Sequence, residues 1–264
     1  MALRETAYTD YTSITELPGS PATREQLARF SHRYHTAACH ARGRRVLEIA
    51  CGAGLGTGYL AEQADRLVAG DYTESLLKIA HDHYRDEIPL VRFDAHSLPF
   101  REDSFDLAVL FEAIYYLARP EEVLTEIRRV LAGKGLLLIA TVNKDWSGFS
   151  PSEFSTRYFS VPELVELLVD RGFDTLEVFG AFPTQAASSA ARIVTRLRAM
   201  AVALGLVPGT LAARRALKRL FYGKLTPMSH KVVDQAVQDF PLMPIPGDES
   251  TTEFKVYYVL AGAG

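Results

Sequence analysis

A glycine-rich stretch between residues 46 and 58 constrains the fold of this chain more than any other feature. The residues that open it, Val46–Ile49, are apolar apart from Glu48, and they predict the end of a buried strand. Four glycines and little side-chain bulk follow in Ala50–Gly58, and apolar residues then return at helical spacing. Small residues let the backbone of such a turn approach a ligand closely, and the next helix offers unpaired N–H groups at its N-terminus. We therefore predict a nucleotide-type cofactor site at this turn.

Two kinds of cofactor turn have this geometry, and the residues around the glycines distinguish them. A dinucleotide-binding turn has the pattern G-x-G-x-x-G, which Gly52 and Gly54 fit, whereas the third position is Thr57. The carboxylate of Glu48 also disfavours a pyrophosphate and suits a positively charged partner such as an amino group. From Glu48 onward the stretch resembles the first motif of class I S-adenosylmethionine (SAM) methyltransferases, acidic-x-Gly-x-Gly-x-Gly, with Ala50 at the family's first glycine. A tight turn in an ordinary α/β fold is the alternative.

A second acidic residue, Asp71, ends the apolar run that begins at Arg66. It follows the glycine turn by about twenty residues, the interval typical of a carboxylate that binds ribose hydroxyls. The resemblance implies the same role, because the family has an acidic residue at the end of its second strand. It also implies that Tyr72 and Leu76 flank the adenine ring. Alternatively, Asp71 only caps the helix predicted over residues 75–84.

A third predicted strand, Pro89–Ala95, ends in a pair of residues that resembles the family's adenine-binding corner. The resemblance implies that the carboxylate of Asp94 accepts a hydrogen bond from the exocyclic amine of adenine. It implies also that the backbone N–H of Ala95 donates to the ring. This pairing is chemically apt, because adenine presents an amine donor beside a ring-nitrogen acceptor.

The next predicted strand, Leu107–Phe111, is followed by an acidic and two aromatic residues. Ligands of open α/β sheets bind beyond the carboxyl ends of the strands, so we place Phe111 beside the cofactor. Glu112 is a candidate base, and equally a supporting hydrogen-bond acceptor. Tyr115 and Tyr116 are candidates to line the acceptor pocket or to orient its nucleophile. The alternative is that both tyrosines pack under the next helix.

Residues 1–43 are predicted to form a helical lid segment, with a helix that Pro21 opens and that ends near His40. In small-molecule methyltransferases, segments placed like this often lie over the cofactor. The resemblance therefore makes Tyr11, Arg33 and Tyr34 candidates to contact SAM. The alternative is a packing helix with solvated arginines.

The predicted fold is α/β, with a doubly wound, mostly parallel, seven-stranded sheet that resembles the Rossmann-like sheet of class I methyltransferases. An amphipathic helix over Glu121–Leu131, ended by Gly133–Gly135, precedes a fifth strand over Leu136–Val142. Ser160 and Glu163 predict a capping box at the start of a later helix. Three units are predicted to follow the lid segment. Residues 44–183 form a SAM-binding core, residues 184–253 form a helical insertion, and residues 254–264 return to the core as its final strand.

The insertion is distinguished by its charge. Between Val178 and Val233 the chain has nine Lys and Arg residues and no Asp or Glu, although its overall net charge is −3. Such a basic segment is a candidate to attract a phosphorylated or acidic substrate, or to contact an anionic membrane surface peripherally. A solvated face paired with the acidic core, or a homodimer contact, is the alternative.

The composition restricts the class of protein but does not identify its function. The 264 residues are 48% hydrophobic and 23% charged, as in a globular protein, and the two cysteines form neither a disulfide framework nor a metal cluster. The start of the sequence has no apolar signal core, so we expect a cytoplasmic protein. The histidines His32, His35 and His40 lack Cys or carboxylate companions at ligand spacing, so we expect no metal site. We predict a SAM-dependent methyltransferase acting on a small molecule, with a lean to a phosphate-bearing, glycan-related or lipid-linked acceptor. The alternatives are an RNA methyltransferase using the basic insertion, although base-methylation signatures are absent, and a non-catalytic SAM-fold binding module.

Overall fold

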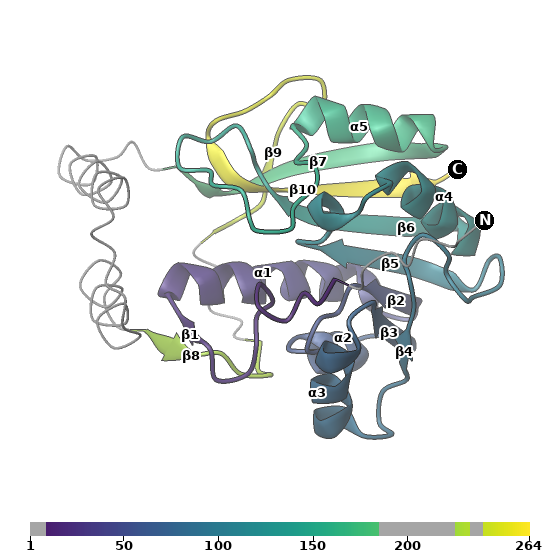
Figure 1. The fold of residues 1–264 in the computed structure, drawn as a ribbon. Coiled ribbons are helices and arrows are strands. Elements are labelled where there is room, and N and C mark those ends of the chain that lie inside the picture. Colours follow the sequence, from purple (N-terminus) through teal and green to yellow (C-terminus); the bar gives the residue numbers. More distant parts are fainter. Residues whose placement is uncertain (1–8, 185–224, 233–239) are drawn as a thin grey trace, which may run out of the picture.

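A central sheet with helices on both faces organises the molecule (Figure 1). The structure, a computed structural model, describes residues 9–184, 225–232 and 240–264. The sheet has eight strands in the order β4-β3-β2-β5-β6-β10-β7-β9. The strands of this sheet are β2 (Arg45–Ile49), β3 (Arg66–Asp71), β4 (Leu90–Arg92), β5 (Phe105–Phe111), β6 (Leu131–Val142), β7 (Phe173–Pro183), β9 (Met243–Pro244) and β10 (Phe254–Ala263). The helices are α1 (Arg24–Ala41), α2 (Thr57–Ala61), α3 (Glu74–Tyr84), the short 3₁₀ helix η1 (Ile114–Tyr116), α4 (Pro120–Val130) and α5 (Val161–Asp170).

The sheet is mostly parallel, as predicted. Strands β4, β3, β2, β5 and β6 pair in parallel, whereas β10 runs antiparallel between β6 and β7. The chain first builds outward from β2 to β4 and then returns to place β5 on the other side of β2. This reversal opens a crevice beyond the carboxyl ends of β2 and β5, where ligands of such sheets bind. An eighth strand, β9, pairs with β7 and was not predicted, because two residues carry no periodic signal.

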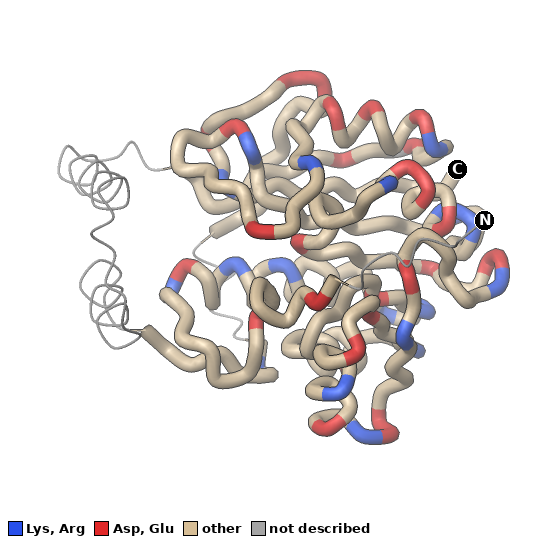
Figure 2. The backbone as a smooth tube through the Cα atoms, viewed as in Figure 1, with Lys and Arg blue, Asp and Glu red and all other residues tan. Residues whose placement is uncertain are grey.

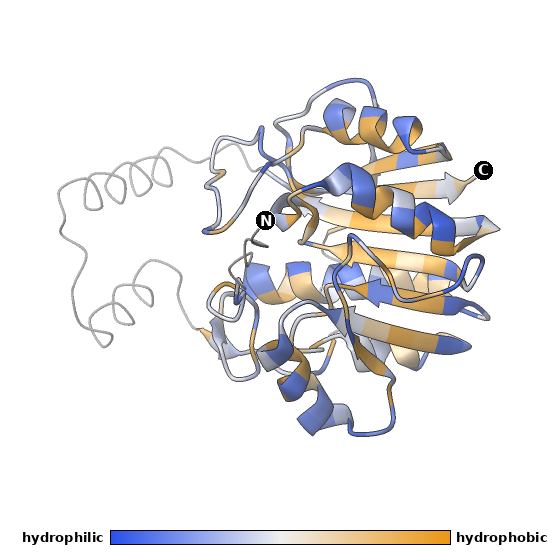
Figure 3. Cartoon of the chain, turned by 45° about the vertical axis from the view of Figure 1, so that its right-hand side comes forward, coloured by the Kyte–Doolittle hydropathy of each residue, from blue (hydrophilic) through white to orange (hydrophobic). Residues whose placement is uncertain are grey.

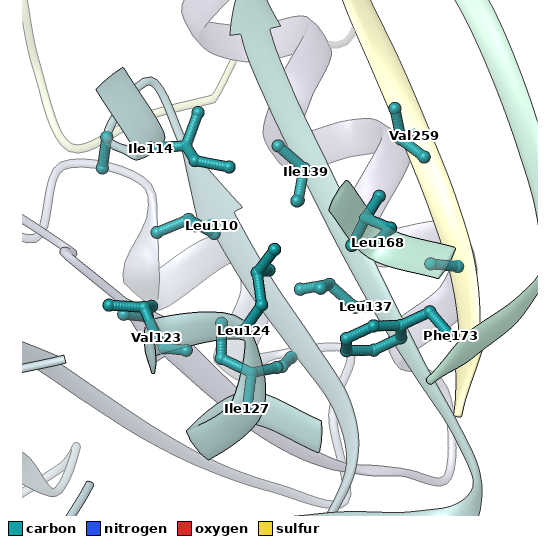
Figure 4. Packing of buried hydrophobic residues seen from close by; sticks show 14 of the residues in the cluster. Leu110, Ile114, Val123, Leu124, Ile127, Leu137, Ile139, Leu168, Phe173 and Val259 are labelled. Carbon is teal, nitrogen blue, oxygen red and sulfur yellow. The ribbon is translucent and has the colours of Figure 1, made fainter. Parts of the chain in front are cut away.

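Alternating side chains of the strands build two hydrophobic layers. In β5, Leu107 and Val109 face the layer that includes α1 and α2, whereas Ala108 and Leu110 face the layer under α4 and α5. Figure 4 shows the second layer, in which α4 lays Val123, Leu124 and Ile127 against the sheet. Figure 3 shows apolar residues concentrated in the strands and polar residues on the outer faces of the helices. Burial on both faces explains why β5 and β6 have nearly continuous apolar sequences.

The boundaries predicted for two helices are wrong. Helix α1 begins at Arg24 rather than at Pro21, because Thr23 and Gln26 form a capping box in which each side chain accepts the other's backbone N–H. Pro21–Ala22 instead form the two-residue strand β1, which pairs with β8 (Thr226–Pro227). Helix α4 ends at Val130, and β6 begins at Leu131. Pairing of Leu131 with Phe105 of β5 draws the following glycines into the start of β6 instead of a helix cap.

The capping box predicted for the later helix is confirmed. The Ser160 backbone N–H donates to the Glu163 carboxylate at 2.7 Å and so starts α5. Most of the insertion predicted to be helical, residues 185–224 and 233–239, lies outside the described residues. In the described part of the chain, basic and acidic residues are interspersed (Figure 2). No described helix is both long and apolar enough to span a bilayer.

Candidate functional site

A cavity of about 610 Å³ lies at the carboxyl ends of β2, β3 and β5. Its volume is within the range of small-molecule sites, about 300–1,000 Å³. The glycine turn after β2, the ends of β3 and β5, helix α1 and residues 9–16 line it. The cavity therefore occupies the crevice that the strand order creates.

The glycine turn has three left-handed residues, of which one is not glycine. Gly52 and Gly54 have φ of +58° and +70°, and Ala50 has φ of +58°. An L-residue with a Cβ is strained there, which accounts for the glycine that the family motif has at this position. Helix α1 packs directly on the turn, since a Cβ on Gly56 would lie 2.2 Å from the Tyr34 ring. The turn thus keeps its small residues for backbone conformation and for close packing.

Asp71 joins the glycine turn to the start of α3. Its Oδ2 accepts the Gly52 backbone N–H at 2.9 Å, and its Oδ1 accepts the Thr73 backbone N–H at 2.8 Å. Asp71 is 7% exposed, and burial raises the pKa of its carboxyl group. A carboxylate offers about four acceptor positions, so two remain for a ligand in the cavity that Asp71 lines. The predicted helix-capping role and a ligand-binding role are therefore compatible.

The predicted adenine-site residues lie together at one end of the cavity. Its lining there includes Tyr72, Leu76, Asp94 and Ala95. The Asp94 carboxylate is held by His96, whose backbone N–H and Nδ1 lie 3.0 and 2.6 Å from Oδ1. The sequence reasoning missed His96, because a histidine two residues after a strand-end aspartate has no distinctive spacing.

Glu48 occupies a different position from the one expected for a residue that contacts the ligand. It is 2% exposed and is not on the cavity lining. The Tyr34 hydroxyl donates to its Oε1 at 2.7 Å, and its Oε2 has no hydrogen-bond partner among the described residues. Burial raises the pKa of Glu48 to about 7. Gly54 also lies off the lining, and its carbonyl accepts the Tyr84 hydroxyl at 2.6 Å.

The other end of the cavity is formed by residues after β5. Phe111, Glu112, Tyr115 and Tyr116 all line it. Glu112 has φ of +49°, a conformation that strained functional residues often adopt. The Tyr115 hydroxyl donates to Glu112 Oε2 at 2.9 Å. A carboxylate and three aromatic rings therefore meet at this end.

The N-terminal segment covers the cavity. Tyr11 lies with its ring centroid 5.6 Å from that of Tyr116, and the Glu16 carboxylate pairs with Arg33 of α1. The Thr12 and Ser75 hydroxyls are 2.7 Å apart and join this segment to α3. Tyr11, Arg33 and Tyr34, the predicted candidates of this region, line the cavity.

The sequence reasoning missed other lining residues of this region. Among them are Glu16, Gln26 and Arg29. Gln26, Arg29 and Arg33 share one face of α1 by their spacing of three and four residues, a signal that was present in the sequence. Glu16 had no such signal, because its position depends on how the N-terminal segment crosses the sheet.

The cavity suits the chemistry of SAM at two points. Asp71 has acceptor positions for two ribose hydroxyls. Asp94 and the neighbouring apolar side chains Leu76 and Phe93 can hold adenine by its amine and its ring faces.

Comparisons with known proteins agree with this geometry. Residues 47–139 match the family model described as a methyltransferase domain. A probable S-adenosylmethionine-dependent methyltransferase of Mycobacterium tuberculosis is 32% identical over 155 residues, 56% of each chain. A similarly named protein of Mycolicibacterium smegmatis is 31% identical over 63% of this chain and 66% of the relative. A demethylmenaquinone methyltransferase of Clavibacter sepedonicus is 32% identical over 50% of this chain and 47% of the relative. The chain thus spans little more than half the length of the first of these relatives.

Solved structures share the fold. A SAM-dependent methyltransferase of Thermotoga maritima, described as a possible histamine N-methyltransferase, has a TM-score of 0.56 at 16% identity and covers 90% of this chain and 92% of its own. The cyclase SpnF has a TM-score of 0.55 at 20% identity and covers 91% of this chain and 83% of its own. At these identities the likeness establishes the fold alone.

Proposed function

Because this chain belongs to the class I SAM-dependent methyltransferase family, we propose that it transfers the methyl group of SAM to a small-molecule acceptor. The family's cofactor is SAM, and the motif from Glu48 to Gly54 lies inside the matched methyltransferase domain. The observation that carries the proposal is the single cavity that Asp71 and Asp94 line at one end and Glu112 at the other.

The lining divides into a cofactor half and an acceptor half. In the proposed arrangement Asp71 binds the ribose, Asp94 and Ala95 bind adenine, and Tyr72 with Leu76 flank its ring. The glycine turn with Arg33 and Tyr34 surrounds the amino-acid portion, and Tyr11 and Phe111 lie between the two halves. Residues 44–183 and 254–264 then form the cofactor-binding core, and the described residues 9–43 form its cover.

SAM supplies a methyl group on a positively charged sulfur, which any well-aligned nucleophile can attack. The protein's part is to hold the acceptor in line and to exclude water. Residues 9–16 serve the second task, because they lie over the cavity and are bonded to α1 and α3. The acceptor half, with Tyr11, Tyr115 and Tyr116, suits a molecule with an apolar or aromatic portion.

The finer substrate class is inferred from two features. The relative from Clavibacter sepedonicus is named for a menaquinone precursor, a lipid-linked acceptor. The basic stretch between Val178 and Val233 supports an acceptor with an anionic or membrane-associated portion. We therefore favour a lipid-linked acceptor over a phosphate-bearing or glycan-related one.

Calorimetric titration with SAM and with S-adenosylhomocysteine tests the cofactor assignment. Asp71→Ala removes charged hydrogen bonds and should weaken binding about 10- to 100-fold, whereas Asp82→Ala on the exposed side of α3 should not. Gly52→Arg should abolish binding, because a Cβ there lies 2.9 Å from Thr15 and φ is +58°. Gly133→Arg is the matched control, since nothing lies within 4 Å of a Cβ at that position. Absence of heat with both ligands would remove the proposal.

A further inference from the structure

Glu112 is held in a strained conformation at the end of β5. Its φ of +49° is unfavourable for a residue with a side chain. Its backbone N–H donates to the Ala140 carbonyl of β6 at 2.8 Å, which keeps it within the edge of the sheet. The result is a carboxylate on the cavity lining, next to the strand-order reversal where the ligand crevice opens.

One oxygen of this carboxylate is occupied and the other is not. Tyr115 donates to Oε2 at 2.9 Å, and within the described chain Oε1 accepts no hydrogen bond. Burial raises the pKa of Glu112, and Arg33 and Arg29 oppose that rise. The titratable and charged groups facing it are Arg29 and Arg33 from α1, Glu16 from the N-terminal segment, Tyr115 and Tyr116 from η1, and Tyr257 and Tyr258 from β10.

Tyr115 is itself fixed, so it aims the carboxylate. Its ring stacks on Tyr158 with centroids 4.6 Å apart, and its backbone carbonyl accepts the Thr156 N–H at 2.8 Å. The neighbouring Tyr116 donates instead to Ser152 Oγ at 2.7 Å. Only one of the two adjacent tyrosine hydroxyls therefore serves Glu112, and it leaves the second carboxylate oxygen for the cavity.

We propose that Glu112 is a catalytic residue that accepts the proton of a hydroxyl group on the acceptor, and that Tyr115 is its positioning residue. This inference rests on the proposed methyltransferase function. The acceptor O–H bond breaks and its proton passes to Glu112 Oε1. The electron pair left on oxygen forms the bond to the methyl carbon, whose bond to sulfur breaks with its electron pair remaining on sulfur.

The chemistry favours a hydroxyl carried on an aromatic ring. General-base catalysis is efficient when the pKa values of base and substrate are not far apart, and a buried carboxylate is closer to a phenol than to an aliphatic alcohol. The lining agrees, because Tyr11 and Tyr116 both present aromatic side chains to the cavity, and an aromatic acceptor packs well against such side chains.

Binding of two small probes in the presence of S-adenosylhomocysteine tests this without turnover. Phenol can donate a hydrogen bond to Glu112, whereas anisole has the same ring and no O–H. Ligand-observed NMR should show phenol binding about five- to tenfold tighter at pH 8 than at pH 5, because a carboxylate accepts a stronger hydrogen bond than a protonated acid. Anisole binding should not change with pH.

Variants separate the roles of the two residues. Glu112→Gln, which preserves shape, should remove the pH dependence of phenol binding and leave the affinity for S-adenosylhomocysteine intact. Tyr115→Phe should raise the pH below which phenol binding weakens, because the Tyr115 hydrogen bond lowers the pKa of Glu112. Tyr116→Phe removes a hydroxyl that binds Ser152, so it should leave that pH unchanged.

Three results would overturn the inference: phenol binding no tighter than anisole at pH 8, a pH dependence that survives in Glu112→Gln, or a Glu112→Gln variant that loses S-adenosylhomocysteine. The first two leave the methyltransferase proposal standing, provided that the wild type binds the cofactor. The third reassigns Glu112 to the cofactor half.

Discussion

At the scale of single residues, the glycine turn contains one position where the chain departs from the residue that its conformation favours. Ala50 has φ of +58°, and the family motif has glycine there. The left-handed conformation costs an L-residue about 1–2 kcal/mol, and glycine's greater unfolded entropy returns about 0.5–1 kcal/mol of that. Ala50 is therefore a strained residue inside the glycine-rich turn.

Ala50→Gly should raise the free energy of unfolding by about 0.5–1 kcal/mol, measured by urea denaturation. Ala53→Gly is the matched control in the same turn, because Ala53 is buried and is not among the residues with positive φ. It should lose about 1–2 kcal/mol from its methyl group and from backbone entropy. Equal losses in both variants would contradict the assignment of strain to Ala50.

At the scale of elements, the contact between β2 and α1 passes through a buried carboxylate. Glu48 at the end of β2 accepts the Tyr34 hydroxyl, and the Tyr34 ring lies over Gly56 and 5.4 Å from the Phe111 ring. One tyrosine of α1 thus contacts the first strand, the turn and β5. This contact holds α1 against the crevice beyond β2 and β5.

Glu48→Gln should change how stability depends on pH. The folded protein raises the pKa of Glu48 from 4.5 to about 7, so the protonated form is favoured on folding. That stabilisation is fully present below pH 4.5 and is lost as the pH rises through 7, by about 3 kcal/mol at most. Unfolding free energies at pH 5 and pH 8 should show this loss in the wild type and not in Glu48→Gln. The exposed Glu87→Gln should behave as the wild type, and an unchanged pH dependence in Glu48→Gln would refute the assignment.

At the scale of the whole molecule, a histidine of α1 joins the helix to the last strand and to the segment before it. His32 is 1% exposed, with Nδ1 2.7 Å from the Tyr258 hydroxyl and Nε2 2.8 Å from the Phe240 carbonyl. A carbonyl only accepts, so Nε2 carries the proton and Nδ1 accepts from Tyr258. Burial lowers the pKa of His32. Segments more than 200 residues apart in sequence are thereby joined.

His32→Leu should lower the free energy of unfolding by about 2 kcal/mol at pH 8, because two polar groups lose their partner. In the wild type, stability should fall as the pH decreases below 6.5, since protons bind the unfolded histidine first. In His32→Leu, the fall in stability below pH 6.5 should be smaller than in the wild type. His40→Leu, on the same helix, should change stability by less than about 0.5 kcal/mol. A His32→Leu variant as stable as His40→Leu would show that this junction contributes nothing.

The sequence by itself determined what depends on neighbouring residues. Apolar runs and their spacing predicted the parallel strands and α4, Ser160 and Glu163 predicted the start of α5, and the glycine pattern located the turn beside the cavity. These signals act through backbone conformation and burial over a few residues, so they survive without knowledge of the fold. The positions of Asp71 and Asp94 near the cavity could be predicted too, because the carboxyl ends of parallel strands lie at the same edge of the sheet.

Only the tertiary structure decided which side chains meet across the crevice. Glu48 turns to Tyr34 instead of lining the cavity, Glu16 pairs with Arg33, and Tyr115 rather than Tyr116 serves Glu112. Each of these contacts except the last joins separate elements, and all of them depend on packing angles and rotamers that local patterns do not encode. The sequence gives the position of a carboxylate along the chain. Its hydrogen-bond partner depends on which groups the folded molecule brings within reach.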